Sequence, residues 1–338
     1  MAKILVTGGC GYIGSHCIVE LLQQGHQVLS VDNYSRSRPE AMANIERITG
    51  EKVHNYAVDL CNMDETVAVF TEHPDVDGII HFAAFKEVGE SEDKPLLYYH
   101  NNLNALINIL LCAVDFEVPQ FIFSSSCTVY GSPDVACVTE NTVWKPAASS
   151  YGATKQMGEE IVTSTVKRYP FMKAALLRYF NPVGAHPSLL IGELPKGRPA
   201  NLVPAITQAA IGKIKDFTVH GTDYDTKDGS CLRDFIHVSD IARAHVNAFD
   251  YLKNNNEEER THIYNLGTGN GVTVLELIQA FEKVNGVKLD YKKGERRPGD
   301  VEAIYANNQK ARQDLHWEPL YGLEEMMRTA WEWEKKLN

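Results

Sequence analysis

Residues 7–14, Thr-Gly-Gly-Cys-Gly-Tyr-Ile-Gly, directly follow a short apolar run at 3–6 and lead into a helix-like segment at 14–24. Gly8, Gly11 and Gly14 form a G-x-x-G-x-x-G pattern. Glycines at this spacing permit a tight turn, and they let the N–H groups of a helix N-terminus approach a pyrophosphate. The order of strand, glycine turn and helix therefore predicts a dinucleotide-binding loop.

The rest of the first half alternates in the same way. Apolar runs that suit strands buried on both faces occur at 3–6, 27–31, 53–58, 78–82, 120–123 and 174–178, and helix-like stretches such as 14–24 and 101–114 separate them. This alternation predicts an α/β fold with a Rossmann-type, doubly wound parallel sheet. Ligands of such sheets bind beyond the carboxyl ends of the strands, so residues at those ends are the candidates for a site.

Charge and cysteine content exclude several classes of function. The 338-residue chain has a formal net charge of -11, which argues against nucleic acid or an anionic membrane as a partner. No apolar segment approaches the ~18 residues that read as a membrane span. The seven cysteines are scattered and form no C-x-x-C pair, which indicates reduced thiols and a cytoplasmic protein without a metal site.

Asp32 follows the second predicted strand, 18 residues after the last glycine of the turn. A carboxylate there can accept hydrogen bonds from an adenosine ribose, and its charge disfavours a ribose 2′-phosphate. The sequence therefore favours NAD over NADP, although Arg36 and Arg38 lie close enough to weaken that preference. After the third predicted strand, Asp59 and Leu60 are candidates to flank the adenine; the alternative is that Asp59 caps the next helix.

Two further strand ends carry candidate site residues. The fourth predicted strand leads into Phe-Ala-Ala-Phe-Lys at 82–86, whose small residues admit a cofactor and whose Lys86 offers a positive charge. The fifth is expected to be followed by Ser124, Ser125 and Ser126. Hydroxyls there can orient a substrate alcohol or cap the next turn, and these alternatives stay open.

Tyr151 and Lys155, in Tyr-Gly-Ala-Thr-Lys at 151–155, share one face of a predicted helix because they are four residues apart. An ammonium beside a phenol favours the phenolate, so the pattern predicts that Lys155 lowers the pKa of Tyr151 from about 10 toward neutrality. A phenolate base beside a dinucleotide indicates interconversion of an alcohol and a ketone. For the pair taken alone, an ordinary surface helix is the alternative.

Together these motifs resemble the extended short-chain dehydrogenase/reductases. The likeness sharpens in Tyr-Ile-Gly-Ser-His (12–16), Val-Gly-Glu-Ser (88–91), Leu-Arg-Tyr-Phe-Asn-Pro-Val-Gly-Ala-His (177–186) and Leu-Arg-Asp-Phe-Ile-His-Val (232–238). With these stretches, nearly the whole chain resembles the UDP-glucose (UDP-galactose) 4-epimerases of galactose metabolism. The resemblance implies a homodimer with tightly held NAD that acts on UDP-galactose and UDP-glucose.

The resemblance also implies roles for individual residues. Tyr151 would accept the proton of the sugar 4-hydroxyl, Lys155 would tune it and Ser126 would orient the hydroxyl, in a reversible epimerisation through a 4-keto sugar with transient hydride transfer to NAD. The implied cofactor residues are Gly8, Gly11, Tyr12, Ile13, Gly14, Asp32, Asn33, Tyr34, Ser35, Arg36, Ser37, Asp59, Leu60, Phe82, Ala83, Ala84, Phe85, Lys86, Asn101, Ser126, Tyr151, Lys155 and Phe180. The implied substrate residues are Lys86, Ser126, Tyr151, Asn181, Asn201, Leu202, His220, Arg233, Arg297, Asp300 and Ile304.

The same resemblance implies two domains with the active site in the cleft between them. An NAD-binding Rossmann domain is expected over residues 1–180 and a smaller α/β lobe that binds the UDP-sugar over 181–338. The boundary is approximate, because some later segments are expected to return to the first domain.

Three places depart from the family pattern. His220 stands where the family has a Phe against the uracil, and Ser-Leu-Leu-Ile at 188–191 replaces a more polar loop. Ile304 matches the gate of the sugar pocket, where relatives with Tyr accept plain hexoses and those with Cys or Ser also admit 2-acetamido sugars. Because Ile is branched and stiff at χ1, UDP-N-acetyl sugars are expected to be poor substrates. The alternative places Ile304 in the lobe core and Tyr305 at the cleft.

Other functions are weighed against this expectation. A nucleotide-sugar 4,6-dehydratase needs an acid just after the catalytic hydroxyl, whereas Ser126 is followed by Cys-Thr-Val at 127–129. A UDP-glucuronate or UDP-N-acetylhexosamine 4-epimerase is excluded less firmly. A non-catalytic dinucleotide sensor would need the glycine turn but not Tyr151, Lys155 and Ser126, and the presence of all three favours an enzyme.

Overall fold

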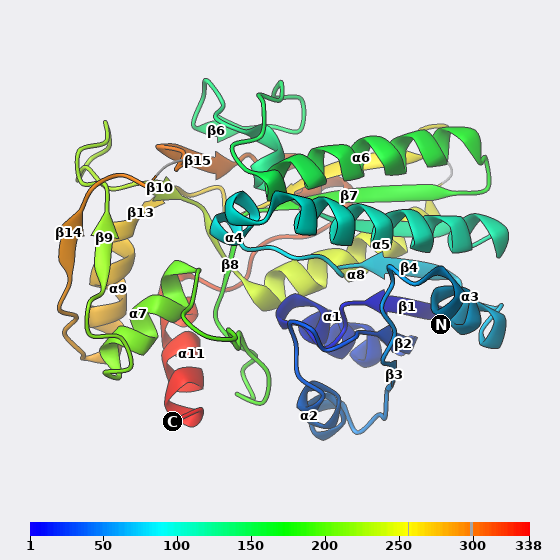
Figure 1. The fold of residues 1–338 in the computed structure, drawn as a ribbon, viewed down its shortest axis with the longest axis horizontal. Helices are drawn as coiled ribbons and strands as arrows, with labels where there is room; N and C mark the ends of the chain where they lie inside the picture. Colours follow the sequence, from blue (N-terminus) through cyan, green and yellow to red (C-terminus); the bar gives the residue numbers. More distant parts are fainter. Residues whose placement is uncertain (256, 298–299) are drawn as a thin grey trace.

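The computed structural model describes residues 1–255, 257–297 and 300–338. Its largest element, within these residues, is a seven-stranded parallel sheet in the order β12-β7-β5-β4-β1-β2-β3 (Figure 1). The reversal of strand order beside β1 confirms the predicted doubly wound, Rossmann-type fold. The strands are β1 (Lys3–Thr7), β2 (Gln27–Val31), β3 (His54–Tyr56), β4 (Gly78–His81), β5 (Gln120–Ser126), β7 (Lys173–Tyr179) and β12 (Thr261–Leu266).

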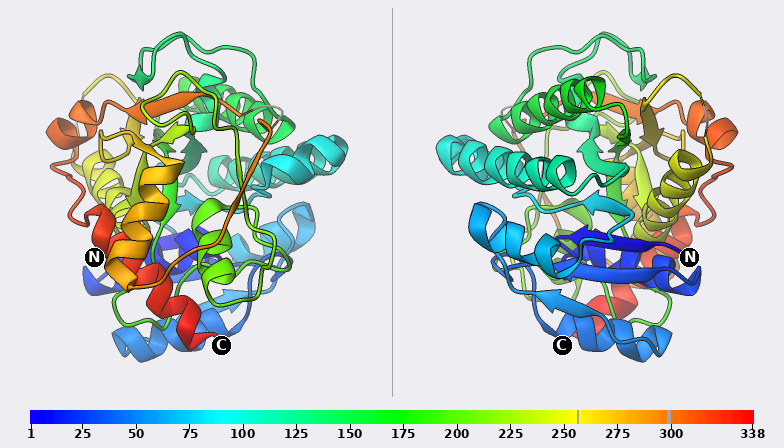
Figure 2. Two further views of the ribbon diagram at one scale, coloured as in Figure 1. Left: turned by 90° about the vertical axis from the view of Figure 1, so that its left-hand side faces the viewer. Right: turned by 90° about the vertical axis from the view of Figure 1, so that its right-hand side faces the viewer.

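Helices cover both faces of this sheet (Figures 1 and 2). In β1, Ile4 and Val6 point into one apolar core and Leu5 into the other, as the period of two in a strand requires. The first core is closed by α1 (Tyr12–Gln23), α2 (Glu40–Thr49) and α8 (Val238–Asn254), and α10 (Gln309–Asp314) lies against β12. The second is closed by α3 (Met63–Glu72), α5 (Pro95–Asp115) and α6 (Ser150–Arg168), with the short α4 (Val88–Asp93) beside α5 and α6.

Two predicted boundaries differ from the structure, and two later segments of the chain pack with the first domain, where a return of such segments is expected. The serine cluster does not follow β5 but forms its end, because the strand runs on to Ser126 beside β7. Helix α5 starts at Pro95, since a proline suits the first turn of a helix, and not at residue 101. β12 and α8, from the second half of the chain, belong to the first sheet and its cover.

The second lobe lies at the left of Figure 1 and is built around a separate core. Phe217, Leu277, Phe281, Met327 and Trp331 belong to this core, which α7 (Leu202–Ala210), α9 (Val274–Asn285) and α11 (Leu323–Lys336) enclose. Short strands complete the lobe and its link to the first: β6 (Cys137–Val138), β8 (Asn181–Val183), β9 (Thr218–His220), β10 (Leu232–Arg233), β11 (Phe235–His237), β13 (Val272–Thr273), β14 (Lys292–Gly294) and β15 (Ala303–Ala306). Among the described residues, no helix combines the length and apolar character of a membrane span.

Asp234 joins the two lobes at the place where the site forms. Its fully buried carboxylate accepts hydrogen bonds from the backbone N–H groups of Thr268, Gly269 and Ala306, at 2.8, 3.0 and 3.1 Å. The carboxylate therefore ties the loop after β12 to β15 and fixes the strands that carry Arg233 and Ile304.

Buried histidines predict that the fold weakens in mild acid. Burial lowers the pKa of His16 and His81 to about 3 and that of His237 and His245 to about 4, from an ordinary value of 6.5. The unfolded chain takes up protons below pH 6.5 while the folded chain does not, so stability is full above that pH and is lost as the pH falls toward 4. The expected slope is about 1.4 kcal/mol per pH unit for each histidine.

Urea unfolding at a series of pH values measures this slope. His245→Gln is expected to make it shallower by about one proton, whereas the same change at the exposed His100 serves as the control. Unfolding free energies that stay constant from neutral pH to pH 5, or a slope insensitive to His245→Gln, would contradict the prediction.

Candidate active site

Ser126, Tyr151 and Lys155 meet where β5 ends and α6 begins. Ser149 caps α6 by accepting a hydrogen bond from the N–H of Gly152 at 3.1 Å, and this cap sets the start of the helix just before Tyr151. Lys155 Nζ donates to the carbonyl of Ser124 at 2.6 Å and lies 5.9 Å from the centroid of the Tyr151 ring. Ser126, Tyr151 and Lys155 are 6, 7 and 4% exposed, so all three act in a largely dry environment.

The electrostatics of this group differ from the prediction. Burial raises the pKa of Tyr151 well above 10, and the Ser126 hydroxyl opposes this only in part. Burial also lowers the pKa of Lys155 to about 8, which the charge of Glu159 counteracts. The prediction that Lys155 lowers the Tyr151 pKa toward neutrality is therefore wrong, because burial of the phenolate is the largest cause and raises this pKa.

The glycine turn between β1 and α1 leaves room for a ligand to approach the backbone N–H groups of the protein. Gly8 has φ +69°, in the left-handed region, and a Cβ there would lie 3.0 Å from the N atom of Ala83. A Cβ on Gly14 would collide with the carbonyl oxygen of Gly8. Gly11 is the N-cap residue of α1 and has no side chain to occupy the N–H groups of the first turn, so Tyr12 and Ile13 present theirs to an anion.

Asp32 stands directly after β2, beside this turn. Its carboxylate accepts hydrogen bonds from the N–H of Cys10 at 3.0 Å, the N–H of Tyr34 at 2.9 Å and the hydroxyl of Ser37 at 2.6 Å. Carboxylate oxygens offer about four acceptor sites, so capacity remains for a ribose hydroxyl. Tyr34 adopts a left-handed φ of 58°, which turns residues 33–37 sharply across the strand end. Asn33 and Ser35 lie on this exposed turn.

The segment after β4 lies at the same edge of the sheet as the glycine turn, because β4 runs parallel to β1. Phe82 N–H donates to the carbonyl of Thr7 at 3.1 Å, and Phe85 N–H donates to Asn102 Oδ1 at 2.8 Å. Asn101 donates to the same Asn102 oxygen. Ala83 and Ala84 lie between these anchors and are half-buried. Phe82–Phe85 and Asn101 therefore form one wall beside the glycine turn.

Two residues near this wall differ from expectation. The Arg36 guanidinium pairs with Glu90 at 2.7 Å and lies 4.6 Å from the Phe85 ring centroid, so an acidic partner and not a ribose phosphate holds it. Asp59 does not cap α3; that role falls to Asn62, whereas Asp59 accepts the N–H of Cys61 at 2.9 Å and Leu60 is buried.

The segment at 193–201 contains site residues that the sequence analysis missed. Glu193 accepts hydrogen bonds from Lys86 Nζ at 2.8 Å and Asn201 Nδ2 at 2.6 Å, so it joins two predicted substrate residues. Lys196 Nζ reaches across to the carbonyls of Tyr34 and Ser35 at 2.8 and 2.9 Å. The contacts of Glu193 with Lys86 and of Lys196 with Tyr34 and Ser35 join residues far apart in the sequence, which local pattern analysis cannot detect.

The preceding loop, at 188–191, is held in place by several contacts. Ser188 Oγ accepts the N–H of Leu190 at 3.2 Å, and Ile191 is buried in the first core. Lys336, in the last turn of α11, donates to the carbonyl of Leu189 at 2.7 Å. Ile191 therefore anchors this loop in the first core, and Lys336 holds its backbone.

The second lobe brings other predicted substrate residues toward the same place. Arg233 Nη2 lies 3.7 Å from Asp300 Oδ1, and the Asp300 N–H donates to the carbonyl of Arg297 at 3.2 Å. Asn181 Oδ1 is buried and has no hydrogen-bond partner among the described residues, as expected for an acceptor that a ligand satisfies. Leu202 begins α7, next to Asn201.

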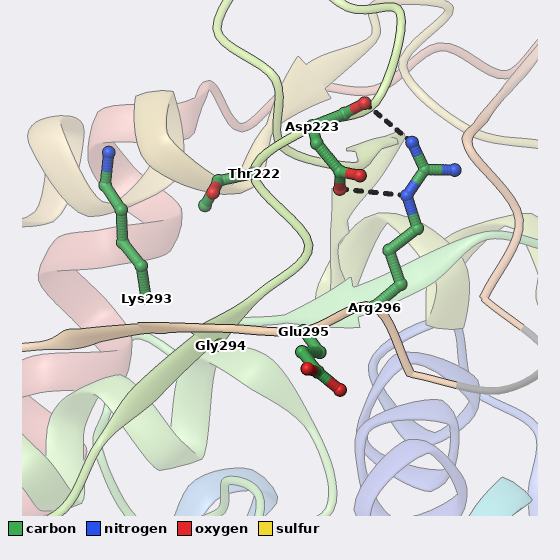
Figure 3. A pocket seen from close by; sticks show the side chains of 6 residues that line it. All are labelled: Thr222, Asp223, Lys293, Gly294, Glu295 and Arg296. Atoms are coloured by element: carbon green, nitrogen blue, oxygen red, sulfur yellow. Dashed lines mark hydrogen bonds and ion pairs between the residues drawn. The ribbon is translucent and has the colours of Figure 1, made fainter.

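His220 and Arg297 lie at the outer end of this lobe. His220 ends β9, where its Nδ1 is 3.2 Å from the carbonyl of Glu295. A surface pocket of about 420 Å³ opens beside it, lined by Thr222, Asp223, Lys293, Gly294, Glu295 and Arg296 (Figure 3). Arg296 is held there by Asp223 at 2.9 Å, and the neighbouring Arg297 is exposed.

Ile304 is 4% exposed and belongs to an apolar cluster with Phe180 and Val129. Tyr305 is half-buried, and because neighbours in a strand face opposite sides, it points away from that cluster. The burial of Ile304 thus agrees with the alternative that this side chain packs in an apolar core. The cluster nevertheless includes Phe180, a predicted cofactor residue, and Val129, three residues beyond Ser126.

Comparison with known proteins agrees with this geometry. Residues 4–267 match the model of the NAD dependent epimerase/dehydratase family. The chain belongs to this family. It is 44% identical to the UDP-glucose 4-epimerase of Pasteurella multocida over 98% of this chain and 97% of the relative, and 45% identical to that of Bacillus subtilis over 98% and 96%.

Solved structures of family members have the same fold over their whole length. The UDP-glucose 4-epimerase of Bifidobacterium longum, in complex with NAD+ and UDP, is 43% identical with a TM-score of 0.94, over 99% of this chain and 98% of that one. The UDP-glucose-4-epimerase of Stenotrophomonas maltophila, with NAD and formylated UDP-arabinopyranose, is 42% identical with a TM-score of 0.95, over 100% and 99%.

Proposed function

We propose that this chain is an NAD-dependent UDP-glucose 4-epimerase that interconverts UDP-galactose and UDP-glucose. The observation that carries the proposal is the meeting of Ser126, Tyr151 and Lys155 beside an intact glycine turn. Full-length similarity to UDP-glucose 4-epimerases supports it. A sensor that only bound a dinucleotide would not need the buried Tyr and Lys.

The residues at the sheet edge fit NAD. Gly8, Gly11 and Gly14 leave room for the pyrophosphate at the start of α1, and the Asp32 carboxylate suits the adenosine ribose diol. When bound, NAD would supply a reversible acceptor for a hydride. Further proposed cofactor residues are the half-buried wall of Phe82–Phe85 with Asn101, the exposed Lys86 that follows it, and the turn at 33–37 that Lys196 covers.

The protein's own residues handle the proton. Tyr151 takes the proton of the sugar 4-hydroxyl as C4 is oxidised to a ketone, and it returns a proton when C4 is reduced on its other face. Ser126 orients the hydroxyl. Lys155 and the positive nicotinamide ring stabilise the phenolate that burial otherwise disfavours. The same groups therefore act in both directions of the reaction.

Inversion at C4 requires the hexose to turn while the UDP stays in place. Arg233 and Arg297 supply the local cations that a diphosphate needs in a protein of net charge -11. Asn181 offers an acceptor that has no partner among the described residues, and Asn201, Leu202, His220 and Asp300 complete the proposed UDP contacts. His220 can stack on a base, though with less apolar area than Phe.

Cofactor analysis tests this proposal. Denaturing the purified protein is expected to release NAD, and a chelator is expected to leave activity unchanged. Release of NADP in place of NAD, or loss of activity with the chelator and recovery with zinc, would contradict the proposal.

The proposed substrate range rests on Ile304. Wild-type protein is expected to use UDP-galactose and UDP-glucose far better than the UDP-N-acetyl sugars, since the branched side chain is packed against Phe180 and Val129. Ile304→Ser is expected to raise the kcat/KM ratio of acetylated to plain substrate by about 10-fold or more. Tyr305→Ser is the control for a one-residue misalignment. If that variant changes the ratio and Ile304→Ser does not, Tyr305 is the gate.

We further propose a homodimer formed through α5 and α6, which lie side by side (Figure 1). Leu96, Ile107 and Leu111 on α5 and Met157 on α6 are 80, 40, 47 and 41% exposed. Two helices from each copy would bury these side chains in a four-helix bundle. Sedimentation velocity at micromolar concentration is expected to give the dimer mass for wild type and the monomer mass for Leu111→Glu. A wild-type monomer would contradict the proposal.

The cellular location and domain roles complete the proposal. All seven cysteines lie in described residues and are free thiols, which supports a cytoplasmic protein. The NAD-binding unit comprises residues 1–180 together with α8, β12 and α10, and most of the rest of 181–338 binds the UDP-sugar.

A further inference from the structure

Helix α6 presents a third buried polar side chain in line with Tyr151 and Lys155. Glu159 is one further turn along the same face and is 2% exposed. All three side chains face the serine-rich end of β5: Ser126 lies at Tyr151, the Ser124 carbonyl accepts from Lys155, and the Ser125 hydroxyl donates to Glu159. The helix therefore contacts the end of the strand at three successive turns. The proposed reaction uses Tyr151 and Lys155 but not Glu159.

Arg178 holds the Glu159 carboxylate in a two-pronged ion pair. Its Nε and Nη2 donate to the two carboxylate oxygens at 2.9 and 2.7 Å, and Arg178 is itself only 1% exposed. Arg178 stands opposite Ser125 in the pairing of β5 and β7. Its Nη1 also donates to the Tyr130 hydroxyl at 3.0 Å and to the carbonyl of Glu140 at 3.1 Å.

A buried ion pair of this kind is a costly way to stabilise a fold, because both charges lose their hydration. Apolar residues of similar volume would often stabilise as much. The pair does, however, place a fixed negative charge one helical turn from a buried ammonium, and its geometry allows little movement of that charge.

We infer that Glu159, anchored by Arg178 and Ser125, is a positioning residue that holds α6 in register on β5 and keeps Lys155 in its ammonium form. The inference rests on the proposed function, in which Lys155 supports the Tyr151 phenolate. Glu159 contacts neither Tyr151 nor the predicted substrate residues, so it acts through Lys155.

The surroundings of Lys155 agree with this role. Burial lowers the pKa of Lys155 to about 8, and the charge of Glu159 is the cause that raises it. Of the other titratable groups nearby, His81 on β4 interacts with the charge of Lys155. Tyr98 on α5, Cys127 after β5 and Tyr179 on β7 act on the neighbouring Tyr151, and Arg178 on β7 pairs with Glu159. His81 is buried with its pKa lowered to about 3, so it is neutral and does not replace Glu159 as a partner.

The test is a titration of Lys155 itself. Protein labelled with ¹³C at the lysine ε-carbons gives one NMR signal per lysine, and Lys155→Met assigns the signal of interest. Wild-type Lys155 is expected to titrate near pH 8, and Glu159→Gln to lower the midpoint by about one pH unit, a tenfold change in the ratio of ammonium to amine. Glu160→Gln, at the exposed neighbouring position, is expected to leave the midpoint unchanged.

A double variant covers the case in which Glu159→Gln does not fold, since that change leaves Arg178 buried without its counter-ion. Glu159→Met with Arg178→Met removes both charges and is expected to shift the Lys155 midpoint in the same direction. In folded variants the alkaline limb of kcat is expected to move to lower pH with KM unchanged. A Lys155 midpoint that is the same in wild type and in the folded variant would overturn the inference. Because the titration needs no turnover, absence of epimerase activity in wild type would count against the proposed function alone.

Discussion

Tyr151→Phe is expected to lower kcat for UDP-galactose by ~10²–10⁴-fold, the range of general acid–base contributions. The change removes the hydroxyl that takes the 4-hydroxyl proton but keeps the ring, which is 7% exposed and packed. NAD content is therefore expected to stay at the wild-type level. Steady-state kinetics, with NAD quantified in the same preparation, measure both effects.

Two controls sharpen this prediction. Tyr169→Phe removes a hydroxyl just beyond the far end of the same helix and is expected to leave kcat unchanged. Ser126→Ala removes an orienting group and not the proton acceptor, so its loss is expected to be smaller. Turnover close to wild type in Tyr151→Phe, with NAD bound, would mean that another residue is the base.

Gly14→Ala is expected to abolish retention of NAD. The new Cβ would collide with the Gly8 carbonyl, and this contact involves backbone that a side-chain rotation cannot relieve. The start of α1 must then move away from the glycine turn, which separates the N–H groups that bind the pyrophosphate. NAD released from the purified variant, compared with wild type, measures the loss.

Gly89→Ala is the matched control, because Gly89 lies in α4 and a Cβ there meets no atom within 4 Å. Alanine also favours helix, so this variant is expected to retain NAD and fold as well as wild type. If Gly14→Ala keeps its full content of NAD, the glycine turn does not hold the pyrophosphate in the way proposed.

Local patterns in the sequence were enough to predict six of the seven strands of the large sheet and the glycine turn after the first of them. The runs at 27–31 and 78–82 became β2 and β4 almost unchanged, because strands buried on both faces need continuous apolar residues. The glycine turn and the Tyr151–Lys155 spacing are likewise local, and the structure sets both beside the strand ends. Asn62, and not Asp59, caps α3, which shows how weakly a single carboxylate in a loop specifies its role.

What the sequence could not supply depends on distant contacts. The pairing of β12 with β7, the reach of Lys196 to the turn at 33–37 and the Glu159–Arg178 ion pair all join segments that no periodicity connects. The pKa of Tyr151 was misjudged for a similar reason. The spacing of Tyr and Lys indicates the ammonium, whereas the burial that raises the Tyr151 pKa comes from several elements packed together.

Incubation of the pure protein with UDP-galactose, without added NAD, is the most direct test of the central claim. Chromatography of the products is expected to show UDP-glucose, and the same final mixture is expected from UDP-glucose as the starting compound, because the reaction is reversible and its cofactor is already bound. UDP-galactose that remains unchanged even when NAD is added, or conversion to a dehydrated keto sugar, would contradict the assignment of this chain as a 4-epimerase.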